Sequence, residues 1–387
     1  MSKEDKKEMM TSRERVQTIL DHKMPDRVAI DIGSTASGLT DPTMKRVKDY
    51  FHITSEDIVF RPDESASRYN DDVLEALGSD FRHVFLMPPE GADWSFDENG
   101  HAMTDWGIQK TMKTNLAQNS SCPLANADSI DDLRHYPWPD PYAPGRDRGI
   151  KERIKDLYEN TTYALAARSV SHGIFELSWE LSGMEKMLVD MMINKEYANY
   201  LLDKILDIQM AMYDVLLTPC GEYVQMVETA DDYGTQRGPM MSPELFEEMI
   251  LPRRKKLNDF IRSKAPHAKI FHHTCGSVYR LLPDILETGV DVLNPVQPSA
   301  ADMDTYRLAE EFGDKVIFHG SIDEQTGLVY GKDVVRKQMK ERVESLGKNG
   351  GYIMAPTSNF QDDMPLENIV NFAKWGKEIG DYSHRRA

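Results

Sequence analysis

The sequence predicts a (β/α)8 barrel that is preceded by a helical extension. Short β-rich apolar runs alternate with amphipathic helical patterns at least six times along the chain, and the turns between them are short. Parallel strands joined by helices form α/β proteins, and this many repeats in one chain favour a closed barrel over an open sheet. With 387 residues, 40% of them hydrophobic, the chain is long enough to fill one such core.

The strands and helices can be placed along the chain in order. We expect strands at residues 27–33, 81–87, 162–168, 222–228, 269–273, 290–294, 315–319 and 352–355. Thr11 and Glu14 have the spacing of a capping box, which predicts the start of the first helix. We expect further helices at residues 42–51, 71–77, 148–160, 184–217 with a break near Asn194, 243–263 with Ser242 as cap, 278–286 and 365–378.

The predicted domain organisation has one barrel and one excursion from it. We expect residues 1–10 to form a disordered tail and residues 11–387 to form a single barrel domain. Residues 88–121 are polar and rich in turns, which predicts a β-hairpin excursion. This excursion is expected to cover one end of the core.

The composition excludes several classes of protein. The formal net charge of -18 disfavours nucleic acid and anionic membranes as partners. No apolar run approaches the roughly 20 residues that a membrane-spanning helix needs. Three cysteines provide no disulfide framework and fit a reducing compartment. We therefore expect a cytoplasmic protein.

A histidine and a cysteine stand at the end of the strand expected at residues 269–273. Because side chains alternate along a strand, His273 and Cys275 can point the same way. Imidazole and thiolate are both ligands of zinc. A hydrogen-bonded histidine beside a small buried cysteine is an equally simple interpretation, and the local pattern leaves both open.

Polar residues recur where the other strands end, which is where barrel active sites lie. Glu228 can complete a three-ligand zinc site with His273 and Cys275, leaving one position open, and Asp232 is the alternative carboxylate. We expect His273, Glu228, His319 and Asn359 to be the catalytic residues. The candidate substrate-binding residues are polar or aromatic: Trp179, Asp232, Tyr233, Asn294, Gln297 and Gln361.

Several stretches of the sequence resemble the uroporphyrinogen decarboxylase superfamily, and within it the corrinoid-dependent methyltransferases. The stretches are Ser242-Pro243, Leu251-Pro252, His273-Thr-Cys-Gly-Ser277, Gly289-Val-Asp-Val-Leu-Asn-Pro-Val-Gln297, Phe318-His-Gly-Ser-Ile-Asp323, Gly350-Gly351 to Pro356, and Asn359-Phe-Gln361. The resemblance implies a (β/α)8 barrel. It also suggests a homodimer.

Two departures from this superfamily bear on the reaction. The decarboxylases carry an arginine-rich segment just after the first strand, whereas residues 31–38 here contain no arginine, so a poly-acid substrate is disfavoured. The branch that methylates coenzyme M has a His-x-Cys pair, which His273 and Cys275 resemble, and a distant cysteine. That cysteine would fall near residues 355–358, which contain no cysteine here. Either a carboxylate such as Glu228 completes the metal site, or His273, His319 and Asn359 act by general acid chemistry without a tightly bound metal.

The resemblance is strongest to the demethylating methyltransferases of anaerobes. It implies transfer of a methyl group from a methoxylated aromatic or methylamine-type donor to the cobalt of a separate corrinoid protein. The chain lacks an Asp-x-His-x-x-Gly pattern, so the corrinoid is expected from a partner. The alternatives are methylcobalamin-dependent transfer to tetrahydrofolate or a thiol, a decarboxylase, and a non-catalytic binder of tetrapyrrole or corrinoid.

Overall fold

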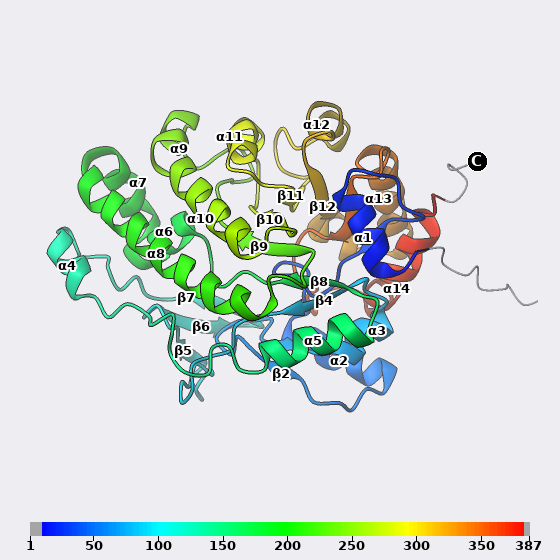
Figure 1. The fold of residues 1–387 in the computed structure, drawn as a ribbon, viewed down its shortest axis with the longest axis horizontal. Coiled ribbons are helices and arrows are strands. Elements are labelled where there is room, and N and C mark those ends of the chain that lie inside the picture. The colour runs from blue at the N-terminus through cyan, green and yellow to red at the C-terminus, as the bar shows by residue number, and fades with distance from the viewer. Residues whose placement is uncertain (1–9, 383–387) are drawn as a thin grey trace, which may run out of the picture.

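The computed structural model describes residues 10–382 and contains a barrel of parallel strands (Figure 1). Eight strands hydrogen-bond in the order β1-β13-β12-β11-β10-β9-β8-β4. They are β1 (Ala29–Ile30), β4 (Phe81–Val84), β8 (Ala164–Ala167), β9 (Met226–Ala230), β10 (Lys269–His273), β11 (Val292–Asn294), β12 (Ile317–Ile322) and β13 (Tyr352–Pro356). The predicted fold class is confirmed. β9 begins later than the predicted residues 222–228, because residues 221–223 form a turn.

Side chains close the seam between β1 and β4, the two ends of the sheet. Ile30 donates its N–H to Asp80 Oδ2 at 2.8 Å, and Asp80 donates its N–H to the carbonyl of Ile30 at 2.8 Å. Ser79 Oγ accepts the N–H of Ile32 at 3.1 Å and donates to the carbonyl of the same residue at 3.0 Å. The barrel is therefore closed here by one main-chain hydrogen bond and by bonds to the Asp80 and Ser79 side chains, in place of a strand ladder.

The helices surround the barrel, except that the first covers its base. They are α1 (Ser12–Leu20), α2 (Asp41–Phe51), α3 (Asp71–Leu77), α4 (Ile130–His135), α5 (Ile150–Asn160), α6 (Ile174–Ser182), α7 (Met184–Ile193), α8 (Lys195–Cys220), α9 (Pro243–Met249), α10 (Leu251–Lys264), α11 (Leu282–Glu287) after the short η1 (Tyr279–Leu281), α12 (Thr305–Phe312), α13 (Lys332–Ser345) after η2 (Glu324–Leu328), and α14 (Leu366–Ile379). The predicted break at Asn194 is confirmed. The predicted helix 243–263 is two helices, because Pro252 cannot donate a backbone hydrogen bond near their junction.

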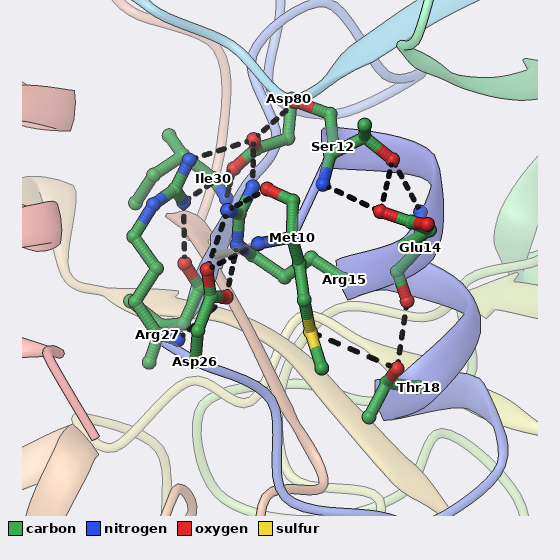
Figure 2. A network of polar contacts seen from close by, with 11 residues as sticks. Met10, Ser12, Glu14, Arg15, Thr18, Asp26, Arg27, Ile30 and Asp80 are labelled. Carbon is green, nitrogen blue, oxygen red and sulfur yellow. Dashed lines mark hydrogen bonds and ion pairs between the residues drawn. The ribbon is translucent and has the colours of Figure 1, made fainter. Parts of the chain in front are cut away.

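Helix α1 closes the base of the barrel with apolar side chains. A buried ion-pair network lies beside the same helix (Figure 2). Its capping box, Thr11 with Glu14, is confirmed. Arg15 pairs with Asp26 at 2.7 Å and with Asp80 at 3.0 Å, and Arg27 pairs with Asp80 at 2.8 Å. This network ties the helical extension to the start of β4.

The predicted tail falls almost wholly outside the described residues. Its last residue, Met10, is described, and its N–H donates to Asp26 at 3.1 Å. The assignment of residues 11–387 to one domain stays a prediction.

The excursion predicted within residues 88–121 is a small antiparallel sheet. It consists of β5 (His101–Met103), β6 (Gln109–Lys113) and β7 (Leu116–Asn119), and a separate hairpin joins β2 (Ile58–Val59) and β3 (Arg68–Tyr69). Ala117 donates its N–H to Ser65 at 2.7 Å, and Asn115 donates to Asp362 at 2.6 Å. The sheet is thus held over one side of the barrel mouth. Within residues 10–382, no helix combines the length and the apolar character needed to cross a lipid bilayer.

Candidate functional site at the barrel mouth

Four side chains at the C-terminal ends of the strands form one hydrogen-bonded chain. His273 Nδ1 lies 2.6 Å from Asn294 Oδ1, and Asn294 Nδ2 lies 2.8 Å from His319 Nδ1. His319 Nε2 lies 3.0 Å from Asp31 Oδ2. The register of β10 and β11 places His273 directly opposite Asn294. The chain therefore crosses the barrel interior from β10 to the end of β1.

The amide of Asn294 sets the tautomer of both histidines, that is, which ring nitrogen carries the proton. Its oxygen can only accept, so Nδ1 of His273 carries the proton, and its nitrogen can only donate, so Nδ1 of His319 is the acceptor. His319 then donates from Nε2 to Asp31, whose pKa is about 2 because His83 and His319 outweigh the effect of burial. The Nε2 lone pair of His273 is left available on the opposite side.

That lone pair faces Cys275 and Asp232. His273 Nε2 lies 3.3 Å from Cys275 Sγ and 3.7 Å from Asp232 Oδ1, and one ligand atom from each residue lies within 4.8 Å of the other two. Donors bound to zinc at about 2.0–2.3 Å in a tetrahedron lie roughly 3.3–3.7 Å apart, so the cluster fits this ion. Burial and the Asp232 carboxylate raise the pKa of the Cys275 thiol well above its usual range, so a bound cation must displace its proton.

The carboxylate of this cluster is Asp232, whereas the primary prediction was Glu228. Glu228 lies inside the barrel, where its Oε1 is 3.4 Å from His83 Nε2 and its Oε2 accepts the N–H of Thr35 at 2.7 Å. Because β9 extends to Ala230, Glu228 is an interior strand residue and Asp232 stands at the mouth. The structure therefore groups His273 and Cys275 with Asp232, the alternative carboxylate, and not with Glu228.

A cavity of about 230 Å³ opens above the cluster, and we call it the mouth cavity. Its titratable lining residues are Arg61, Glu64, Arg168, His172, Glu176, His273 and Cys275. Gln361, predicted to bind substrate, and Asn359, predicted to be catalytic, also line it. Asn359 Oδ1 already accepts the N–H of Gly38 at 2.8 Å.

The mouth cavity contains arginine, contrary to the sequence-based expectation. Arg168 stands at the end of the strand predicted at residues 162–168, and Arg61 follows β2. Burial lowers the pKa of Arg168 to about 10, with partial compensation from Glu228. The segment after the first strand lacks arginine, but these two side chains place guanidinium groups in the cavity from other segments. The lack of arginine in residues 31–38 therefore does not disfavour an acidic substrate.

Five of the six predicted substrate-binding residues do not line the mouth cavity. Asp232 and Asn294 contact the ring of His273 instead. Tyr233 is fully buried, packs against Phe246 and donates its hydroxyl to Asp231 at 3.0 Å. Gln297 accepts the N–H of Gly276 at 2.6 Å and so fixes the turn after Cys275. Trp179 is half-buried on α6 and packs against the core.

A second polar group, which the site prediction did not include, lies where α6 begins. His172 Nδ1 lies 3.0 Å from both carboxylate oxygens of Glu180, and His172 Nε2 lies 3.6 Å from Glu64. Lys110 of the excursion forms an ion pair with Glu64. Glu180, against the effect of burial, raises the pKa of His172 to about 10. The run His172, Glu176, Glu180, at helical spacing, is the sequence signal that could have identified this group.

A further cavity of about 90 Å³ adjoins the mouth cavity, and we call it the side cavity. The two share Arg61, Glu64 and His172. Apolar side chains such as Phe60, Leu86 and Trp106 line part of the side cavity, and charged side chains such as Asp105 and Arg146 line another part. A recess with a partly apolar wall therefore lies next to the polar mouth.

The fold and the site define a (β/α)8 barrel with histidine, cysteine and carboxylate side chains at the C-terminal ends of its strands, where barrel enzymes bind their substrates. The family model described as Uroporphyrinogen decarboxylase (URO-D) matches residues 112–379. Because this match covers more than half of the chain, the protein belongs to the uroporphyrinogen decarboxylase family.

Relatives with established names are distant. The chain is 28% identical over 266 residues to "Uroporphyrinogen decarboxylase 2, chloroplastic" of Oryza sativa subsp. japonica, covering 66% of this chain and 63% of that protein. It is 26% identical over 201 residues to "Uroporphyrinogen decarboxylase" of Prochlorococcus marinus (strain MIT 9515), covering 48% of this chain and 54% of that protein. The match thus spans less than two thirds of either relative.

Among solved structures, the barrel is similar to one titled "methyltransferase from Methanosarcina mazei". The TM-score is 0.65 at 15% sequence identity, and the match covers 95% of this chain and 99% of the other. At this identity the likeness concerns the fold alone.

Proposed function

We propose that this protein is a methyltransferase that moves a methyl group from a small methylated donor to the cobalt of a separate corrinoid protein. The observation that carries the proposal is the cluster of His273, Cys275 and Asp232, of which His273 and Cys275 line the mouth cavity. A barrel shared with a methanogen methyltransferase is compatible with it.

The three cluster residues would hold zinc, which supplies Lewis-acid polarisation of the leaving oxygen or nitrogen of the donor. Asn294 keeps the Nε2 lone pair of His273 directed at the cluster. Cys275 and Asp232 are held relative to each other because Cys275 donates its N–H to Asp232 Oδ1 at 2.7 Å. The chain thus contributes a ligand set whose orientation is fixed before any donor arrives.

The two cavities suggest how the donor lies. Their volumes of about 230 and 90 Å³ suit a small molecule. The apolar wall of the side cavity, which includes Phe60, Leu86 and Trp106, would receive a ring or alkyl part. The methyl group would face the mouth, where the corrinoid of the partner can approach. His172 and Glu176 also line the mouth cavity and could supply a proton to the leaving group. The predicted homodimer and the corrinoid protein are part of this proposal.

The test is methyl transfer to a reduced corrinoid protein, followed by the change in corrinoid absorption, with methoxylated aromatics and methylamines as donors. We expect turnover with at least one donor class, and a loss of about 10²-fold or more in Cys275→Ser and Asp232→Asn. Cys122→Ser, which changes an exposed free thiol, is the matched control and should keep full activity. Equal activity in Cys275→Ser and Cys122→Ser would contradict the proposal.

Decarboxylation of an acidic substrate is the second candidate, because Arg61 and Arg168 place two guanidinium groups in the mouth cavity. The named relatives are uroporphyrinogen decarboxylases. Release of carbon dioxide from uroporphyrinogen, lost in Arg168→Gln, would favour this candidate. Starting the assay from the methylated corrinoid with tetrahydrofolate or a thiol tests the reverse transfer, and binding without any turnover would identify a non-catalytic binder.

A further inference from the structure

Three buried polar atoms converge inside the barrel with no hydrogen-bond partner among the described residues. They are Asp31 Oδ1, His83 Nε2 and Glu228 Oε1, and all three side chains are 0% exposed. His83 Nε2 lies 3.5 Å from Asp31 Oδ1 and 3.4 Å from Glu228 Oε1. These distances exceed the 2.7–3.2 Å of N–H···O hydrogen bonds, and buried polar atoms are rarely left unpaired.

The second polar atom of each of these side chains, in contrast, has a hydrogen-bond partner. Asp31 Oδ2 accepts from His319 at 3.0 Å, and Glu228 Oε2 accepts the N–H of Thr35 at 2.7 Å. His83 Nδ1 lies 3.3 Å from the hydroxyl of Tyr69. Metal ligands show this pattern, because partners behind them hold the outer atoms while the inner atoms face the ion.

We propose that Asp31, His83 and Glu228 bind a second divalent cation of the zinc class, separate from the cluster of His273, Cys275 and Asp232. One ligand atom from each of the three lies within 4.8 Å of the others. Donor atoms about 2.0–2.1 Å from zinc in a tetrahedron lie ~3.4 Å apart, which agrees with the two spacings from His83. Two carboxylates also balance the charge of a divalent ion, and histidine nitrogen and carboxylate oxygen are both zinc ligands.

The position of this site gives the cation a structural consequence. Asp31 directly follows β1, His83 is on β4 and Glu228 is on β9. The cation therefore bridges the seam between β1 and β4, where the sheet lacks a strand ladder. Through Asp31 it is also connected by hydrogen bonds to His319, and so to the mouth cluster.

The competing state is a protonated His83 between two carboxylates. Against the effect of burial, the hydroxyl of Tyr69, Asp31 and Glu228 raise the pKa of His83 to about 10, and the buried Arg168 guanidinium lies near the same carboxylates. A cationic imidazole would neutralise part of their charge. The distances argue against this state, because a charge-assisted N–H···O bond is typically shorter than 3.0 Å.

The test is the zinc content of chains that are stripped with chelator, reloaded with zinc and desalted. We expect two zinc ions per wild-type chain, one in Glu228→Gln, one in Cys275→Ser and none in the double variant. Cobalt(II) reloading assigns the sites, because only the mouth cluster has a thiolate: the thiolate-to-cobalt absorption should persist in Glu228→Gln and vanish in Cys275→Ser. Equal metal content in wild type and Glu228→Gln would overturn the proposal, as would a wild-type chain that binds no ion. If the wild-type chain binds a single ion, its retention in Glu228→Gln and loss in Cys275→Ser would likewise overturn the proposal, whereas the reverse pattern would support the interior site and contradict zinc binding at the mouth cluster.

A second measurement separates loss of the metal site from a general loss of folding in the variants. In the Cys275→Ser background, zinc should raise the midpoint of thermal unfolding, because a ligand that binds only the native state stabilises it. Adding His83→Gln should abolish this rise. If zinc leaves the midpoint of Cys275→Ser unchanged, His83 is the cationic partner of the carboxylates and the metal site is refuted. None of these readouts depends on methyl transfer, so the two proposals can fail separately.

Discussion

Asn294 holds His273 in one tautomer, with its amide oxygen 2.6 Å from His273 Nδ1. The same amide donates to His319 at 2.8 Å, so a single side chain sets the protonation of two histidines. Asn294 is fully buried and belongs to a strand, which makes this arrangement rigid. The zinc binding that we propose for the mouth cluster would therefore depend on a residue that is not itself a ligand.

Replacing Asn294 should weaken zinc binding at the mouth cluster. Asn294→Leu removes the acceptor for His273, and loss of such an outer partner typically lowers metal affinity by about 10–100-fold. Asn294→Asp keeps that acceptor and should retain most of the affinity. Competition with a chelating dye measures both variants in the Glu228→Gln background, where the interior site is disabled. Equal affinities in the two variants would show that Asn294 does not orient His273.

Gly173→Ala should disturb the start of α6. Asp231 accepts the N–H groups of Phe175 at 3.0 Å and Glu176 at 2.8 Å, and a Cβ on Gly173 would lie 2.1 Å from the Asp231 carboxylate carbon. The carboxylate must move, leaving two helix donors unpaired, which costs roughly 1–3 kcal/mol.

Urea denaturation measures this cost against a matched glycine. A Cβ on Gly238 meets no atom within 4 Å, so Gly238→Ala should change the stability by less than ~0.5 kcal/mol. If the two alanine variants are equally stable, the contact between Gly173 and Asp231 does not constrain α6.

The pair of His172 and Glu180 should make stability depend on alkaline pH. The pKa of His172 is raised from 6.5 to about 10, mainly by Glu180, so the native state holds this proton more tightly than the unfolded chain. The stabilisation is complete below pH 6.5 and is lost as the pH rises through about 10. His172→Gln should therefore cost roughly 1.5–3 kcal/mol at pH 6 and much less at pH 10.5, measured by urea denaturation. A pH-independent difference between wild type and variant would contradict this assignment.

The sequence was sufficient to predict the barrel because its strands are buried on both faces and appear as short apolar runs. It was less informative about β9, whose apolar run begins in the preceding turn. This shift decided the choice of carboxylate: a strand ending at residue 228 exposes Glu228, whereas the observed end at Ala230 buries it and presents Asp232. A displacement of two residues therefore changes which carboxylate lies beside His273 and Cys275.

The remaining site residues depend on contacts between distant segments. Asp31 and His83 meet only because the seam between β1 and β4 closes, and periodicity contains no information about that closure. Asp231 caps α6 in place of Gly173, which has no side chain of its own to do so. Local pattern could identify His273 and Cys275 as a pair because two positions along one strand suffice.

Asp80→Asn should be among the most destabilising conservative changes in this protein. Asp80 is 1% exposed and pairs with Arg15 at 3.0 Å and Arg27 at 2.8 Å (Figure 2). Removing one member of a buried ion-pair network typically costs about 3–5 kcal/mol, because the other charges stay buried. Asp49→Asn is the control: Asp49 is 66% exposed and pairs with Lys45 within one helix, so its loss should cost only ~0.3–0.5 kcal/mol.

The pH dependence provides an independent check on the role of Asp80. Although burial opposes it, Arg27 and Arg15 hold the pKa of Asp80 well below its usual 3.8. The stabilisation is therefore complete above pH 3.8 and is lost only as the pH falls toward the native pKa. Urea denaturation between pH 8 and pH 3 should show a constant difference between wild type and Asp80→Asn down to about pH 4, and a smaller one below it. A difference that is already shrinking near neutral pH would mean that Asp80 titrates normally and that its contacts with the two arginines contribute little to closing the barrel base.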